Sequence, residues 1–257
     1  MTSSSLDAYL EGSGLLHRRD PRAKLLATLT LVLALVLTPV GSWVSFGLFG
    51  LIIVAVIAAS GIPPVRLLRR TVIVLPFVLP AVLFLPFLHG GDVLWQAQVG
   101  GWHISLGRTG LVLAGSIVIK AILSALVLGL LMATTRMSDL LRGLSKLGVP
   151  RILTALFGFM YRYLFVLQDE ALRLKAGRDV RYYGGLRVGI SSVGHMAGSL
   201  FLRSYDRAER VYGAMLLRGY DGAYRSLNQL RVNRVDILMV FVAVALVVPI
   251  SLITRLI

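Results

Sequence analysis

The chain has 257 residues, of which 56% are apolar and only 15% are charged, and its mean hydropathy is +0.80. Soluble proteins carry about a quarter charged residues, so this composition predicts an integral membrane protein. The 27 Lys and Arg outnumber the 12 Asp and Glu, which leaves a formal charge of +15, and no Cys is present. The absence of Cys excludes disulfides, thiolate metal sites and thiol nucleophiles.

The apolar stretches predict five transmembrane helices, because a helix needs about 20 apolar residues to cross about 30 Å of hydrocarbon. The first residues lack the features of a secretory signal, so we expect the first stretch to be retained as an anchor. The predicted spans lie near 24–40, 42–60, 71–88, 109–133 and 235–254. The turn Thr38-Pro39-Val40-Gly41 makes the first two a hairpin, and Pro76, Pro80 and Pro86 are expected to kink the third.

The distribution of Lys and Arg beside the spans predicts the orientation, since basic residues are retained on the cytoplasmic side. Segment 17–24 holds four of them and loop 61–70 holds three, whereas turn 38–41 holds none and loop 89–108 holds one. The N-terminus is therefore expected inside. Five spans then place residues 134–234 in the cytoplasm, and this region carries 17 basic and 7 acidic residues.

We therefore predict an all-α, multi-pass membrane protein in three parts. Residues 1–133 form an N-terminal transmembrane region, 134–234 a cytoplasmic region of long helices, and 235–257 a C-terminal transmembrane helix. In the cytoplasmic region, a helix over Arg136–Leu147 is expected to end at Gly148-Val149-Pro150, and a second to run from about 151 to 183.

Two cytoplasmic helices carry apolar stripes that end in arginine. The first stripe is Leu167, Ala171 and Leu174, followed by Arg178 and Arg181. The second stripe is Ala208, Val211 and Met215, followed by Arg218 and by Gly219, which suits the left-handed position after a helix end. Arginines are favoured at a helix C-terminus by its partial negative charge. The alternative is a binding surface for a protein with acidic grooves, since apolar area flanked by guanidinium groups is typical of interface cores.

Three segments carry a family resemblance: LHRRDPRAKLL at 16–26, FMYRYLFVLQDEALRLKAGRD at 159–179 and GSLFLRSYDRAERVYGAMLLRGYDG at 198–222. They resemble the transmembrane T component of energy-coupling factor transporters, in particular the CbiQ type of cobalt importers. The resemblance implies a non-catalytic scaffold in a bacterial plasma membrane. Its partners would be two ATP-binding-cassette ATPases, which bind ATP and Mg, a CbiM-like substrate-binding membrane subunit and a small accessory membrane subunit. The absence of a GxxxxGK[ST] pattern agrees that ATP is bound elsewhere.

The resemblance also implies roles for particular residues. Leu217-Arg218-Gly219 matches the second of two short motifs that dock ATPase subunits in the family. The first motif falls on Gly177-Arg178-Asp179, which departs from Ala-Arg-Gly at both flanking positions, so Arg181 could share or replace the role of Arg178. Met160 and Tyr163 are expected to contact the substrate-binding subunit. The relatives favour cobalt over nickel as the transported ion.

Other functions have weaker support in the sequence. The same component of a vitamin-type importer would have the same sequence features. A stand-alone carrier or channel would leave the cytoplasmic helical region 134–234 unexplained. An intramembrane hydrolase would need Ser116 or Ser124 beside His195, and nucleic-acid binding lacks a stacking aromatic platform. The other histidines, His17, His89 and His103, are too scattered for a metal site. Lys120, in the middle of the fourth span, either meets a carbonyl or a subunit interface, or lines a substrate path.

Overall fold

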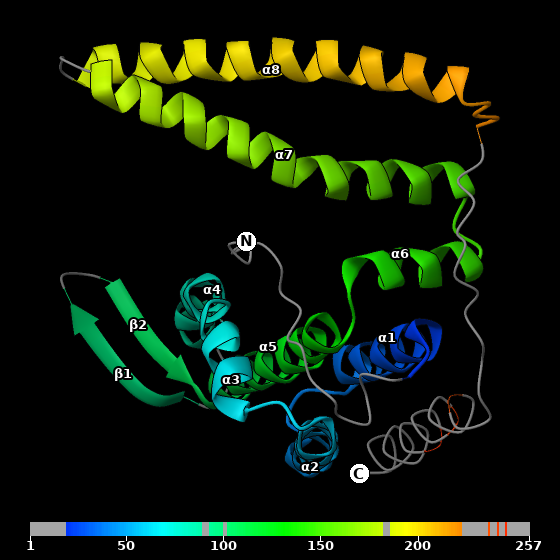
Figure 1. The fold of residues 1–257 in the computed structure, drawn as a ribbon. Helices are drawn as coiled ribbons and strands as arrows, with labels where there is room; N and C mark the ends of the chain where they lie inside the picture. The colour runs from blue at the N-terminus through cyan, green and yellow to red at the C-terminus, as the bar shows by residue number, and fades with distance from the viewer. Residues whose placement is uncertain are drawn as a thin grey trace. The chain divides into compact units, whose positions relative to one another are not determined.

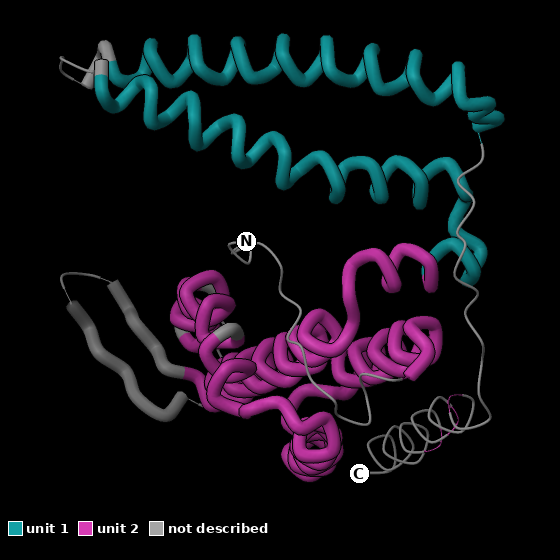
Figure 2. The backbone as a smooth tube through the Cα atoms, in the orientation of Figure 1, with its two compact units in different colours: residues 1–6, 144–229 teal, residues 7–143, 230–257 magenta. Residues whose placement is uncertain are grey.

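The computed structural model describes residues 19–88, 93–99, 102–181 and 186–222, together with the single positions 236, 241 and 245. The chain divides into two compact units (Figure 2). Unit 1 comprises residues 1–6 and 144–229, and unit 2 comprises residues 7–143 and 230–257. The predicted fifth span, 235–254, lies outside the described residues apart from the three single positions.

Unit 2 contains most of the helices (Figure 1). In chain order its elements are α1 (Pro21–Leu37), α2 (Trp43–Ser60), α3 (Pro64–Val72), α4 (Leu75–Leu88), β1 (Val93–Val99), β2 (Trp102–Gly107) and α5 (Arg108–Thr134). Helix α6 (Met137–Lys146) follows and crosses into unit 1, which contains α7 (Arg151–Arg181) and α8 (Leu186–Leu217).

Helix α5 is the central element of unit 2, since α1, α2, α3 and α4 all pack against it. The core contains Leu35, Phe49, Ile53 and Leu67, each at most 2% exposed. At Gly110 the backbones of α4 and α5 approach so closely that an added Cβ would lie 2.7 Å from the Cα of Pro86. A side chain there would force the two helices apart.

Helices α2 and α5 are long and apolar enough to cross a membrane, as predicted for 42–60 and 109–133. Only 33% of the most apolar stretch of α2 and 22% of that of α5 is buried, whereas a core helix of a soluble protein would be mostly buried. Large apolar side chains point outward instead; Leu51 is 70% exposed and Phe77 is 82% exposed. This surface suits lipid better than water.

The predicted turn at 38–41 is present between α1 and α2, although the two helices pack mainly against α5 and not against each other as a hairpin would. Asp20 caps α1 by accepting a hydrogen bond from the Arg22 N–H at 2.9 Å, and Pro21 occupies the first turn, where its missing N–H costs nothing. Helix α1 ends at Leu37 with Thr38 as its C-cap, and Gly41 adopts a positive φ of 84° in the turn that leads into α2.

The predicted third span, 71–88, is not one kinked helix. Helix α3 ends at Val72 and α4 begins at Leu75, with a turn between them in which the Val74 N–H bonds the Thr71 carbonyl. Pro76 has no N–H to bond the carbonyl of Val72, which explains a break at this place. The 14 residues of α4 extend about 21 Å, less than the hydrocarbon thickness.

A second departure from the prediction lies between α4 and α5, within the predicted loop 89–108. Strands β1 and β2 form an antiparallel hairpin, with Val99 paired to Trp102 and Gln98 paired to His103. The sequence signal was available, because two short runs of alternating character flank Gly100-Gly101, a typical hairpin turn pair. All other elements of the described residues are helices, as predicted.

In unit 1, α7 and α8 lie side by side as two antiparallel helices (Figure 1). The predicted stop before α7 is confirmed: Gly148 has a φ of 103°, and the Val149 N–H bonds the Leu144 carbonyl at 3.2 Å. Helix α7 then covers Arg151–Arg181, close to the predicted 151–183.

Candidate docking surface

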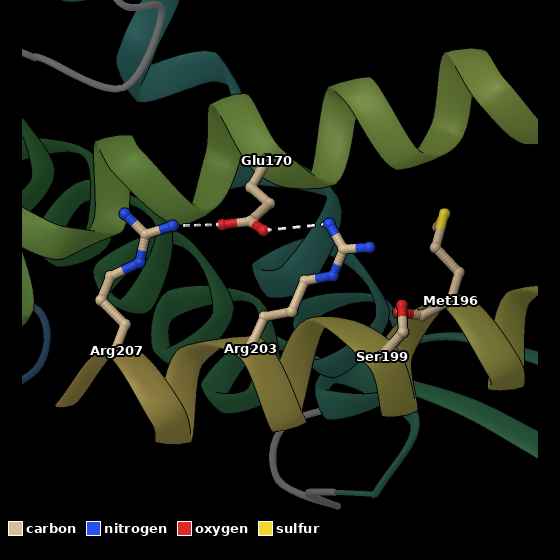
Figure 3. Close-up of polar contacts among 5 residues, drawn as sticks. All are labelled: Glu170, Met196, Ser199, Arg203 and Arg207. Atoms are coloured by element: carbon tan, nitrogen blue, oxygen red, sulfur yellow. Dashed lines mark hydrogen bonds and ion pairs between the residues drawn. The ribbon is translucent and has the colours of Figure 1, made fainter. Parts of the chain in front are cut away.

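The contact between α7 and α8 is centred on one carboxylate. Glu170 of α7 accepts hydrogen bonds from Arg203 at 3.4 Å and from Arg207 at 2.7 Å, and both arginines project from the same side of α8 (Figure 3). Their spacing of four residues puts them one helical turn apart. The Glu170 side chain is only 17% exposed, so these charge-assisted bonds are partly shielded from water.

The same contact borders an open cavity of about 380 Å³. Its lining is mostly charged and consists of Val166, Asp169, Glu170, Arg173, Leu174, Arg203 and Arg207. A charged contact with a cavity differs from the close-packed apolar core that usually joins two helices. The two helices of unit 1 are therefore held together at this point largely by ion pairs.

The predicted apolar stripes lie partly in this region. Leu167, Ala171 and Leu174 are half-buried, and Leu174 lines the cavity. On α8, Val211 and Met215 are half-buried and Ala208 is exposed. The stripes thus serve at least in part to pack the helix pair itself.

Sequence reasoning missed a more exposed apolar set beside the arginines. It consists of Leu172 (54% exposed), Val180 (85%), Tyr212 (57%), Leu216 (50%) and Leu217 (91%). Leu217 belongs to the predicted docking motif; the other four were not predicted, and none of the five lies on the predicted stripes. Large apolar side chains beside otherwise charged helix ends were the available signal.

The end of α8 presents the predicted second motif openly. Arg218 is exposed, and Gly219 has a φ of 79°, which confirms the predicted left-handed position. The Tyr220 N–H bonds the Met215 carbonyl and the Gly219 N–H bonds the Leu216 carbonyl, both at 3.0 Å, which is a Schellman motif. The backbone at Arg218 is therefore well defined although its side chain is exposed.

The end of α7 is different. The guanidinium of Arg178 donates to Asp179 Oδ1 at 2.9 and 3.1 Å, so a neighbouring carboxylate already accompanies this arginine. Arg181 is the last residue of α7, and its side chain lies outside the described part of the chain. Met160 is 53% exposed and Tyr163 is half-buried, both in the first half of α7.

Lys120 meets carbonyl groups, one of its predicted alternatives. Its Nζ donates to the carbonyls of Val36 at 2.9 Å and Thr38 at 2.6 Å. One turn away, the fully buried Ser116 hydroxyl accepts the Gly41 N–H and donates to the Val112 carbonyl. Both side chains therefore satisfy backbone groups of the α1–α2 turn and α5, which is a structural use of Ser116 rather than a nucleophilic one.

Comparison with known proteins decides the family. The model of the family described as cobalt transport protein, CbiQ, matches residues 12–230. The chain belongs to the CbiQ family. CbiQ proteins are T components of energy-coupling factor transporters, so the predicted resemblance is confirmed and the chain is a membrane component of such a transporter.

Three relatives of this CbiQ-family chain are informative. The cobalt transport protein CbiQ of Rhodobacter capsulatus is 31% identical over 149 residues, 58% of this chain and 61% of its own. The transmembrane protein EcfT of Acidaminococcus fermentans is 28% identical over 229 residues, covering 84% and 82% of the two chains. A putative fused cobalt transport protein CbiMQ of Methanocorpusculum labreanum is 27% identical over 137 residues, 52% of this chain and 23% of its own.

Proposed function

We propose that this chain is the non-catalytic transducer of an ATP-driven importer of a divalent transition-metal ion, with cobalt preferred to nickel. It would cross a bacterial plasma membrane five times, with the N-terminus and residues 134–234 in the cytoplasm. Unit 1 would receive two ATPase subunits, which bind ATP and Mg, and unit 2 would lie in the membrane. The observation that carries this proposal is the exposed, arginine-containing end of α8, with Leu217 at 91% exposure beside Arg218.

The end of α8 has the properties of an interface anchor. A leucine exposed to water gains about 1.5–3 kcal/mol when a partner buries it. The adjacent guanidinium offers several N–H donors in a planar fork, which matches a carboxylate in a groove. The Schellman motif holds the backbone before the partner arrives, so little ordering entropy is lost on docking.

Docking at α7 requires one exchange. Arg178 would replace its bond to Asp179 with a bond to an ATPase carboxylate, and Arg181 would assist. Val180, 85% exposed, supplies apolar area between the two arginines. Because one existing ion pair must be given up, we expect the α7 site to contribute less binding free energy than the α8 site.

A separate subunit would capture the substrate. The fused CbiMQ relative supports a CbiM-like partner, because in that protein the two parts belong to one chain by name. Met160 and Tyr163, in the apolar first half of α7, are the proposed contacts for this subunit. The EcfT relative keeps a vitamin-type importer open as the second candidate.

The docking test compares two double variants in the complete complex. Arg178→Glu with Arg218→Glu should abolish co-purification of the ATPases and metal uptake, because an arginine that anchors an interface costs about 2 kcal/mol or more when its side chain is lost. Arg162→Glu with Arg151→Glu changes the same charge on exposed positions of α7, far from the two helix ends, and should leave co-purification of the ATPases unchanged. Full assembly and uptake in the first variant would refute the docking role. Uptake by the chain alone, without ATPases, would instead identify a stand-alone carrier.

A further inference from the structure

The segment LHRRDPRAKLL lies at the start of α1, and the docking function leaves it unexplained. Two of its five charged residues are buried: Asp20 is 6% exposed and Lys24 is 4% exposed. Buried charges are expensive unless other groups compensate them. Their partners therefore indicate why the charges are there.

Lys24 contacts the end of the central helix. Its Nζ donates a hydrogen bond to the carbonyl of Thr134, the last residue of α5, at 3.0 Å. This carbonyl is one that the helix itself cannot satisfy. The Lys24 ammonium also interacts electrostatically with Asp139, in the first turn of α6, and with Asp236 and Asp20.

Asp236 comes from the far end of the sequence. It is 3% exposed, and its Oδ1 accepts a hydrogen bond from the Asp20 N–H at 3.4 Å, although 216 positions separate the two residues. The chain passes from unit 2 to unit 1 after Gly143 and returns to unit 2 at Leu230. Thr134 therefore precedes the outgoing connection closely, and Asp236 follows the returning one.

Close packing reinforces the outgoing side. A Cβ at Gly143 would lie 3.1 Å from Leu25 Cδ1 and 3.5 Å from the backbone of Pro21 and Arg22. The C-terminal half of α6 thus lies directly on the first turn of α1. The same turn of α1 contacts the chain on its way out and on its way back.

We propose that Asp20, Lys24 and Asp236 form a buried clamp that holds both connections between the two units on the first turn of α1. Through the clamp, a movement imposed on unit 1 would displace α1 and α5 rather than bend the connections. The clamp residues are positioning residues for transport, and this role rests on the proposed function. Unlike Arg178 and Arg218, they would be needed for coupling and not for assembly.

The test uses the complete reconstituted transporter and measures three quantities: ATPase co-purification, ATP hydrolysis, and metal uptake per ATP. Lys24→Met should preserve the first two and lower uptake per ATP by about tenfold or more, since removing one partner of a buried charge cluster is strongly unfavourable. Lys24→Arg keeps the charge and the donors and should restore most of the uptake. Lys146→Met, at the exposed last residue of α6, is the matched control and should change nothing.

Cross-linking keeps the clamp testable if Lys24→Met folds poorly. Because the natural chain contains no Cys, Leu25→Cys with Gly143→Cys introduces a single pair at the α1–α6 contact. Asp236→Asn weakens the clamp but leaves the Lys24–Thr134 bond in place, so it should also lower uptake per ATP. The disulfide should restore uptake per ATP in the Asp236→Asn variant. Unchanged uptake in Lys24→Met, equal failure of Lys24→Arg, or loss of the ATPases from the Lys24→Met complex would each overturn the proposal. Loss of the ATPases only in the Arg178/Arg218 variant supports docking independently of the clamp.

Discussion

The ammonium group of Lys120 bonds the carbonyls of Val36 and Thr38, where α1 ends. The last carbonyls of a helix have no partners within it. Lys120 lies about 18 Å along α5 from Arg108, in the middle of a helix apolar enough to span a membrane. If α5 spans as proposed, the α1–α2 turn lies below the membrane surface, where water cannot supply the missing hydrogen bonds.

Lys120→Met keeps the length and the apolar stem of the side chain and removes the two bonds. Hydrogen bonds between helices in membranes average about 0.6 kcal/mol and reach about 1.7 kcal/mol. A lysine at the centre of a span costs about 2.5–3.5 kcal/mol to insert. This cost is the same when α5 is inserted but not yet packed, so it does not contribute to the free energy of unfolding within the membrane. We therefore expect two short bonds from a charged donor to dominate, and the free energy of unfolding to fall by about 2 kcal/mol.

The measurement is unfolding by SDS in mixed micelles, followed by tryptophan fluorescence. Trp43 is a local reporter, since its ring lies 3.2 Å from the Cβ position of Gly115 on α5. Leu128→Met introduces the same residue on the same helix at a position that is 46% exposed, and should change stability by less than about 0.5 kcal/mol. A Lys120→Met protein as stable as the natural one, or more stable, would show that removing a charge from the middle of the span outweighs the loss of the two bonds.

Two further predictions concern unit 1. Glu170→Gln removes the negative charge that Arg203 and Arg207 share. Because those arginines are 57% and 36% exposed, we expect the free energy of unfolding to fall by only about 1 kcal/mol. We also expect α7 and α8 to lie further apart in spin-label distance measurements. High salt should reproduce part of this separation in the natural protein and none in the variant, and equal salt responses would contradict the ion-pair assignment. Gly219→Ala places a side chain at a φ of 79°, so it should lower the free energy of unfolding by about 1 kcal/mol and weaken ATPase binding. The control is Gly213→Ala, inside α8 with open space around it, which should stabilise the helix by about 0.5–1 kcal/mol. Equal effects of the two alanines in thermal unfolding and binding would show that the left-handed position is unimportant.

Local patterns predicted the local features correctly. Apolar runs located α2 and α5, and turn residues located the helix breaks at Gly41 and Gly148 and the end of α8 at Gly219. These features depend on nearest neighbours: hydrocarbon length, glycine at positive φ, and unpaired groups at helix ends. The break before Pro76 and the β-hairpin follow similar local rules, but the prediction assigned the same residues to a single apolar span over 71–88 and to the loop 89–108.

The tertiary structure decided which groups those local features meet. Periodicity identified a stripe through Leu174 but could not show that Glu170, beside it, binds Arg203 and Arg207. In the sequence, Lys24 and Asp20 are ordinary charged residues at the start of a span. In the structure, the partner of Lys24 lies 110 positions away and that of Asp20 lies 216 positions away. The physical reason is that a buried charge depends on its surroundings for stability, and those surroundings are assembled from distant parts of the chain only when it folds.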